Sequence, residues 1–295
     1  MLIVAGSKKN MFKFDFSTSK DEHEKESGKL EIEWLPAQEI NPNLVRTNSL
    51  IESLEEKDIK RFQSGELEIK YMSTDYAVNR LVFYDEENII LNTEHSHSDL
   101  LPGKYEGGLK IWEGTQDLAN YLNKEYSSLK DKSVLDLGCG AGILGILACF
   151  KNANVVFQDY NSSVINLYTI INVFLNDFND PEKFAYKFFS GDWESFTTLR
   201  ENFKKFDMIL TSETIYNVDN YEKLHSVFEK TLSENGIIFL AAKSYYFGVG
   251  GGTRQFEEFL KKKNIFISEV VWKFTGGVNR EILKIFLFEI STTPN

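Results

Sequence analysis

Short apolar runs alternate with amphipathic segments along the C-terminal two thirds of this chain. Apolar runs bounded by glycine or polar residues predict strands over residues 132–137, 155–158, 184–189, 206–211 and 236–242. Apolar positions at helical spacing predict helices over residues 115–126, 143–151, 162–176, 220–232 and 253–263. Strands that alternate with helices in this way are typical of a doubly wound, mostly parallel sheet.

The first third of the chain lacks this regular pattern. Residues 1–60 are acidic, polar and poorly periodic, and we expect them to be partly disordered. Residues 61–94 contain short alternating stretches, at 67–71 and 80–84 among others, which predict a small β-rich extension. The main domain is therefore predicted to span residues 95–295.

The stretch SVLDLGCGAGILG, residues 133–145, joins a predicted strand, a glycine loop and a predicted helix. Glycines let the backbone approach a ligand closely, and the N-terminus of the following helix offers N–H groups without an intrahelical partner. A strand, a glycine-rich turn and a helix in this order build a nucleotide-binding site.

Two carboxylates distinguish between the nucleotides that such a loop can bind. The glycine spacing also fits the pattern of nicotinamide dehydrogenases, but Asp136 stands two residues before the first glycine, where dinucleotide-binding strands usually stay apolar. Asp159 follows the next strand, 21 residues after Gly138, where an acid can accept hydrogen bonds from both ribose hydroxyls. The pattern favours S-adenosyl-L-methionine (SAM), with a dehydrogenase as the weaker alternative.

The same loop indicates the fold class. The spacing D-x-G-x-G-x-G over residues 136–142 resembles the first motif of class I methyltransferases, whose seven-strand sheet ends in an antiparallel hairpin. Here residues 266–274 and 281–290 predict that hairpin. We therefore predict an α/β fold: a doubly wound, seven-strand class I methyltransferase (Rossmann-like) sheet with a small N-terminal extension. Ligands of such sheets bind beyond the carboxyl ends of the strands, near the switch in strand order.

Charge and cysteine content limit the classes of partner. The net charge is −11, of which −8 falls on residues 1–100. An acidic surface disfavours direct DNA binding, which uses basic patches, and suits a basic protein partner. The two cysteines predict neither a disulfide framework nor a metal site, and no apolar run is long enough to span a membrane. We expect a monomer in a reducing compartment, the cytoplasm or the nucleus.

Six further segments lie where the domain begins or where predicted strands end: HSDL (97–100), GGLKIWEGT (107–115), QDYN (158–161), GDW (191–193), TSETIYN (211–217) and YFGVGGG (246–252). Together they closely resemble the eukaryotic protein-histidine N-methyltransferases, over roughly residues 95–295. That family methylates a histidine of large-subunit ribosomal protein three. The resemblance implies SAM as the methyl donor and this basic ribosomal protein as the partner.

The resemblance also implies cofactor contacts, which join those expected from the glycine loop. The predicted cofactor-binding residues are Ile111, Trp112, Glu113, Gly114, Thr115, Asp136, Gly138, Gly140, Gln158, Asp159, Tyr160, Gly191, Asp192, Trp193 and Ser212. Asp159 is expected to hold the ribose, Asp192 to accept from the adenine amino group and Trp193 to cover the adenine ring. Core packing is the competing interpretation of Trp112 and Trp193.

Residues 212–217 leave the fourth predicted strand beside the cofactor site, so Glu213, Tyr216 and Asn217 are the predicted catalytic residues. A lysine with a pKa near 10.4 costs about 4–5 kcal/mol to deprotonate at pH 7, whereas a histidine with a pKa of about 6.5 is already mostly neutral. A histidine methyltransferase therefore mainly has to fix the imidazole tautomer. Each of the three side chains can accept the N–H of the other ring nitrogen.

Two alternatives stay open. Protein-lysine methyltransferases of the seven-strand type typically carry Asp-x-x-Tyr after the fourth strand, where this chain has Glu213 and Tyr216. A non-catalytic SAM-fold ribosome-assembly factor would carry damaged cofactor motifs, and none is damaged here. We further expect residues 246–252 to form a substrate-binding lid and His225 to lie on a helix surface.

Overall fold

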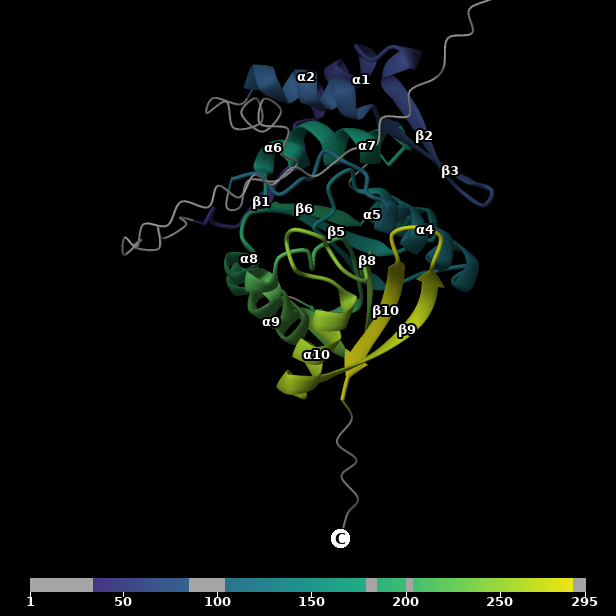
Figure 1. Ribbon diagram of the computed structural model, residues 1–295. Coiled ribbons are helices and arrows are strands. Elements are labelled where there is room, and N and C mark those ends of the chain that lie inside the picture. The colour runs from purple at the N-terminus through teal and green to yellow at the C-terminus, as the bar shows by residue number, and fades with distance from the viewer. Residues whose placement is uncertain (1–33, 85–103, 179–184, 200–203, 289–295) are drawn as a thin grey trace, which may run out of the picture.

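A central β-sheet organises the computed structural model, which describes residues 34–84, 104–178, 185–199 and 204–288. Within these residues the sheet has eight strands: β1 (Gln38–Ile40), β4 (Ser133–Leu137), β5 (Asn154–Asp159), β6 (Tyr186–Ser190), β7 (Phe206–Ser212), β8 (Leu232–Lys243), β9 (Phe266–Phe274) and β10 (Arg280–Leu287). Their order is β1-β6-β5-β4-β7-β8-β10-β9 (Figure 1). Strands β4 to β8 run parallel, and β1, β9 and β10 pair antiparallel to their neighbours.

Helices cover both faces of this sheet. One face carries α4 (Glu113–Glu125), α5 (Ile143–Phe150), α6 (Ser162–Val164), the π-helix η2 (Ile165–Thr169) and α7 (Ile170–Leu175). The other carries α8 (Trp193–Leu199), the short 3₁₀ helix η3 (Val218–Asn220), α9 (Tyr221–Thr231) and α10 (Thr253–Lys263) (Figure 1). Alternate residues of β4 divide accordingly, because Val134 packs into the first core and Leu135 and Leu137 into the second. The predicted doubly wound sheet is therefore present.

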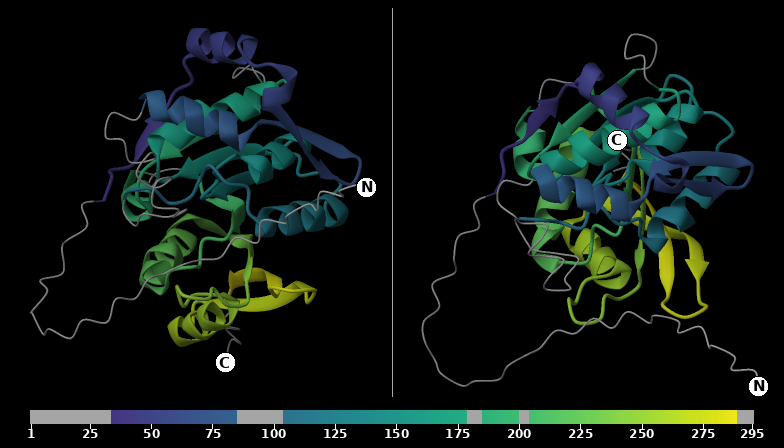
Figure 2. Two further views of the ribbon diagram at one scale, coloured as in Figure 1. Left: turned by 45° about the horizontal axis from the view of Figure 1, so that its top comes forward. Right: turned by 90° about the horizontal axis from the view of Figure 1, so that it is seen from above.

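The N-terminal region adds a strand and an outer layer. Strand β1 pairs with β6 at the edge of the sheet opposite the β9–β10 hairpin (Figure 2), which makes eight strands where seven were predicted. Helix α1 (Leu44–Glu52), the 3₁₀ helix η1 (Glu56–Asp58), the hairpin β2 (Ile59–Ser64) and β3 (Leu67–Met72), and helix α2 (Thr74–Tyr84) follow. They lie over α6 and α7, where the Asn172 side chain accepts a hydrogen bond from the Met72 N–H at 2.8 Å.

The prediction of a strand at residues 80–84 is wrong, because these residues form the last turn of α2. A short apolar run does not by itself distinguish a strand from a helix. Strand β3 lies where the other alternating stretch predicted it. The domain boundary predicted at residue 95 lies outside the described residues, and so do residues 1–33 of the region predicted to be partly disordered.

The strand order switches beside β4. Strands β5 and β6 lie on one side of β4, and β7 and β8 lie on the other. The loops that leave the carboxyl ends of β4 and β7 therefore diverge and leave a crevice between them, which is where sheets of this kind bind ligands. No helix in the described part of the chain is long and apolar enough to cross a membrane.

Candidate active site

The glycine loop after β4 passes very close to the segment that precedes α4. A Cβ on Gly140 would lie 2.6 Å from the carbonyl oxygen of Gly108, and Gly140 has a φ of 48°. No other residue fits this approach without a shift of the backbone. The hydroxyl of Thr169, in the π-helix η2, donates to the Gly140 carbonyl at 2.7 Å. Both contacts hold the loop in one position at the floor of the crevice.

Two buried carboxylates support this loop from opposite sides. Asp136 accepts a hydrogen bond from the Gly145 N–H at 2.8 Å, and burial raises its pKa to about 8. Asp159 accepts from the Gly140 N–H at 2.8 Å, and burial raises its pKa to about 6. Only 5% of Asp159 is exposed, yet it lines the crevice. Its charged form is therefore destabilised unless a bound ligand donates to it.

A cleft opens at this point, with about 920 Å³ of space that includes the part open to solvent. Most of the predicted cofactor-binding residues line it: Ile111, Trp112, Thr115, Asp136, Gly138, Gly140, Asp159, Tyr160, Asp192, Trp193 and Ser212. The structure thus brings together segments that are up to about 100 residues apart in the sequence.

The other predicted residues lie outside the cleft lining and hold its walls. Gln158 is fully buried, accepts from the Trp193 indole N–H at 3.1 Å and donates to the Gly191 carbonyl at 2.8 Å. The Gly114 N–H donates to Glu213 at 3.1 Å. The Glu113 carboxylate is mostly exposed and lies 3.7 Å from the Lys243 ammonium. These positions favour a supporting role over direct contact with a ligand.

Asp192 already has partners for both carboxylate oxygens. One oxygen accepts from the Glu194 N–H at 2.9 Å, at the N-terminus of α8. The other pairs with the Lys223 ammonium at 2.6 Å. The structure therefore favours helix capping and an ion pair for Asp192 over acceptance from an adenine amino group.

The three predicted catalytic residues differ in their surroundings. The carboxylate of Glu213 is buried and accepts from the Gly114 N–H and the Tyr246 hydroxyl, and burial raises its pKa. The Asn217 side chain accepts from the Asp219 N–H at 3.0 Å, caps η3 and is absent from the cleft lining. Tyr216 and Glu213 both line the cleft.

The Tyr216 hydroxyl donates to the carboxylate of Glu106, which also lines the cleft. Burial, with Glu106 nearby, raises the pKa of Tyr216, so this hydroxyl stays protonated and remains a donor. Sequence reasoning missed Glu106, although it stands directly before the GGLKIWEGT motif. It also missed Trp34, Lys110 and Lys223, which line the same cleft.

The glycine-rich loop after β8 is anchored at its end and exposed at its tip. The Gly251 N–H donates to the Tyr216 carbonyl at 3.2 Å, and the Tyr246 N–H donates to the Gly251 carbonyl at 2.8 Å. The Phe247 side chain, in contrast, is 74% exposed. The side chains at the tip of this loop are thus the ones that a partner can contact. The motif at residues 97–100 lies outside the described residues.

Comparison with known proteins adds to this geometry. A family model described as "Lysine methyltransferase" matches residues 102–263, more than half of the chain. The chain belongs to this methyltransferase family. The match begins at the segment with Glu106 and ends at the last residue of α10, so it takes in the glycine loop, the two carboxylates and the Glu213–Tyr216 segment.

Curated relatives of this methyltransferase carry the name of a histidine-specific enzyme. The Histidine protein methyltransferase 1 homolog of Bos taurus is 44% identical over 224 residues, which cover 68% of this chain and 60% of that protein. The Dictyostelium discoideum homolog is 45% identical over 192 residues, 64% of this chain and 60% of that protein. The chain thus spans about 60% of the length of these relatives. The resemblance stated from the motifs is confirmed.

A solved structure confirms the fold of the methyltransferase. The SAM-dependent methyltransferase of Agrobacterium tumefaciens superimposes with a TM-score of 0.50 at 12% identity and covers 80% of this chain and 72% of that chain. At this identity the likeness concerns the fold alone, a class I methyltransferase sheet. Membership of this methyltransferase family identifies SAM as the cofactor, as the glycine loop predicted.

Proposed function

We propose that the protein transfers a methyl group from SAM to an imidazole nitrogen of a histidine in a basic protein, with large-subunit ribosomal protein three as the substrate. Relatives 44% and 45% identical, named as histidine protein methyltransferases, support the reaction. The motif resemblance supports the substrate. The excess of 11 acidic charges suits a basic partner.

The residues of the cleft fit the cofactor. SAM supplies an electrophilic methyl group on a positively charged sulfur. We assign Asp159 to the ribose hydroxyls, because it is a buried carboxylate at the end of the second strand and faces the cleft. Trp193 is held by Gln158 and offers an aromatic surface to the adenine. Gly138 and Gly140 allow the methionine part of SAM to approach the backbone of the loop closely.

The observation that carries the proposed mechanism is the hydrogen bond between Tyr216 and Glu106 at the cleft. An imidazole that attacks with one nitrogen must direct the N–H of its other nitrogen elsewhere. We assign Glu106 to accept that N–H, which fixes the tautomer and aims the lone pair at the methyl group. The ring gains the methyl group as the methyl–sulfur bond breaks and S-adenosylhomocysteine is left, so the ring becomes a cation. The same carboxylate would stabilise that charge and then accept the N–H proton, which leaves a neutral methylhistidine. Tyr216 orients Glu106.

A lysine acceptor is the second candidate, because the matching family model is described as a lysine methyltransferase. An ammonium must first lose a proton, and the position that carries Asp in seven-strand lysine enzymes is Glu213 here. Both carboxylate oxygens of Glu213 already accept hydrogen bonds, from Gly114 and from Tyr246. Glu213 is therefore held as part of the cleft wall, and the names of the relatives that are 44% and 45% identical support histidine over lysine.

One experiment tests the acceptor directly. The purified protein is incubated with isotopically labelled SAM and ribosomes from cells that lack it, and the label is mapped by mass spectrometry. We expect methylhistidine in large-subunit ribosomal protein three. Methyllysine at the labelled position, or no transfer to ribosomal proteins, would reject the proposal.

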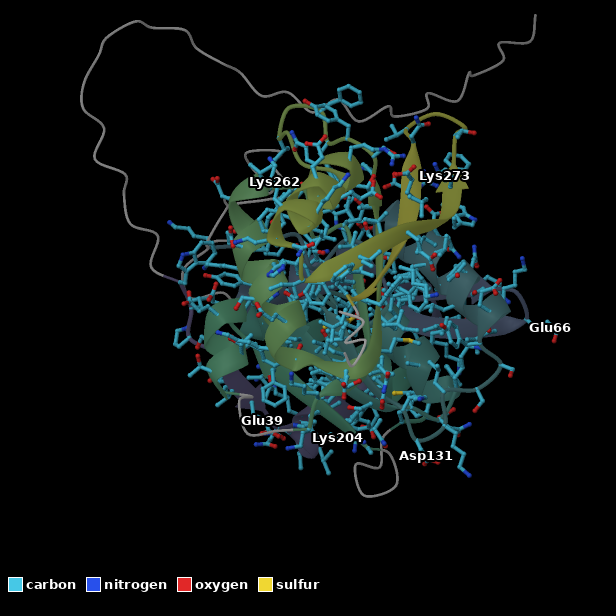
Figure 3. The ribbon with its side chains drawn as sticks, turned by 90° about the horizontal axis from the view of Figure 1, so that it is seen from below. Glu39, Glu66, Asp131, Lys204, Lys262 and Lys273 are labelled. Carbon is cyan, nitrogen blue, oxygen red and sulfur yellow. The ribbon has the colours of Figure 1, made fainter. Side chains whose placement is uncertain are left out.

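A pair of matched variants tests Glu106. Glu106→Gln should lower kcat by about 100-fold or more, the usual effect of removing a proton acceptor, with the affinity for S-adenosylhomocysteine within about threefold of wild type. Glu66→Gln is the control, because Glu66 stands at the exposed tip of the β2–β3 hairpin (Figure 3). Full activity of Glu106→Gln would refute the assignment.

A further inference from the structure

The segment before β1, residues 34–37, runs from the sheet edge to the cleft. Strand β1 pairs with β6 in the register Gln38 to Ser190. Three hydrogen bonds extend this attachment toward the cleft: the Ala37 N–H donates to the Ser195 hydroxyl at 2.8 Å, the Leu35 carbonyl accepts from the Asp192 N–H at 2.8 Å, and the Leu35 N–H donates to the Tyr160 hydroxyl at 3.2 Å. Leu35 and Ala37 are therefore held by hydrogen bonds close to Trp34.

Gly191 shows how closely this segment passes the GDW motif. A Cβ on Gly191 would lie 2.5 Å from the Pro36 carbonyl oxygen and 2.5 Å from the Ala37 Cα, both of them backbone atoms. Gly191 also has a φ of 107°, which disfavours any other residue. The close passage of the N-terminal segment thus explains why the GDW motif begins with a glycine.

Trp34 reaches the same end of the cleft as the residues after β5 and β6. Its ring lies edge-on to Tyr160 with 6.0 Å between ring centroids, and both residues line the cleft. The Lys223 ammonium lies over the Trp34 ring, 3.4 Å from its centroid, and pairs with Asp192 at 2.6 Å. The indole is therefore oriented by a cation that is itself held by an ion pair.

We propose that residues 34–40 are part of the cofactor site and that the Trp34 indole forms a wall of its adenosine end. This end is defined by Asp159, which we assigned to the ribose, and by Trp193. A flat aromatic base packs favourably against an indole. The inference rests on the use of SAM and not on the identity of the methyl acceptor. It extends the site beyond residues 102–263, the part that the family model covers.

Fluorine NMR tests this contact in the full chain without changing its fold. The chain has four tryptophans, so 5-fluorotryptophan labelling gives four resonances, which Trp→Phe variants assign. We expect the Trp34 resonance to shift on saturation with S-adenosylhomocysteine, together with that of Trp193. The Trp272 resonance, on β9, should not move. A Trp34 resonance that stays unchanged while the Trp193 resonance shifts would overturn the proposal.

Affinity measurements give the second arm. By calorimetry, Trp34→Ala should weaken the binding of S-adenosylhomocysteine at least about tenfold, and Trp34→Phe should restore most of it because a ring is retained. Trp272→Ala, the matched control, should bind within twofold of wild type. A Trp34→Ala affinity within twofold of wild type would refute the inference. Because neither arm uses an acceptor, a protein that binds this ligand but methylates no histidine would reject the proposed reaction alone.

Discussion

Asp159 is a buried residue whose charge weakens the fold and which we propose binds the ribose of the cofactor. Burial raises its pKa to about 6, from an ordinary value of 3.8. A difference of about two pKa units corresponds to about 3 kcal/mol of unfolding free energy. Because the folded state holds the proton more tightly, this stability is complete below the unfolded-state pKa and is lost as the pH rises through about 6. At neutral pH, the ligand-free protein therefore carries a destabilising charge.

The variant Asp159→Asn removes that charge with little change of shape. The difference in unfolding free energy between Asp159→Asn and the wild type should shift by about 1–2 kcal/mol in favour of the variant between pH 5 and pH 8. The reason is that position 159 carries a titrating carboxylate only in the wild type. At pH 8, its affinity for S-adenosylhomocysteine should fall by about 10- to 100-fold, since hydrogen bonds to a charged acceptor contribute about 1.5–3 kcal/mol.

Urea unfolding of the ligand-free protein at both pH values measures the first effect, and calorimetry measures the second. Asp131→Asn is the control: Asp131 is exposed in the turn before β4 (Figure 3) and has a φ of 63°, a conformation that Asn tolerates well. A stability difference that stays constant or narrows as the pH rises would refute the argument about burial. An unchanged affinity would refute the ribose assignment.

Three further predictions concern the segments around Tyr216. Gly251→Ala should lower the unfolding free energy by about 3 kcal/mol in urea, because its Cβ would lie 2.2 Å from a backbone oxygen. A Cβ on Gly250 would have no atom within 4 Å, so Gly250→Ala should lower the unfolding free energy by only about 1 kcal/mol, through its positive φ. Glu213→Gln should lose about 1–2 kcal/mol in the same assay and lower kcat, since it weakens the contacts of the carboxylate; an unchanged kcat would contradict a positioning role. Phe247→Ser should change stability by less than about 0.5 kcal/mol but raise KM for the ribosomal substrate, and an unchanged KM would remove the loop tip from the substrate interface.

The sequence predicted the central fold well because its signals there are local. Buried parallel strands appear as apolar runs, and the loop after β4 needs glycine where the backbone turns and approaches Gly108 closely. Strand β1 has three residues and its partner β6 lies about 150 residues away, so no local pattern indicates it. His225 was wrongly expected on the surface of α9. It is 4% exposed and packs against Phe259 and Phe266, as its spacing from Phe228 on the apolar stripe could have indicated.

The residues of the candidate site also differ in whether a local sequence pattern predicts them. Residues that we propose bind through glycine geometry or a carboxylate at a strand end, such as Gly140 and Asp159, follow from the motif and its place in the fold. Glu106 and Trp34 gain their place only when segments far apart in the sequence close over the cleft. Their neighbours, and not their own local sequence, decide what they contact, so a single sequence gives little sign of them.

The TSETIYN motif (211–217) connects several segments of the site through hydrogen bonds. The Ser212 hydroxyl bonds to a threonine of α4 at 2.9 Å, and Glu213 binds the N-terminus of α4 and the Tyr246 hydroxyl. Glu213 adopts a φ of 59°, which is strained for a residue with a side chain, and two partners on separate segments hold it there. Tyr216 then reaches Glu106. One short turn thus fixes the cofactor wall, the glycine-rich loop and the Glu106 carboxylate relative to one another. For a reaction whose rate depends mainly on alignment, we therefore expect Glu213 to affect turnover through the residues that it holds in place.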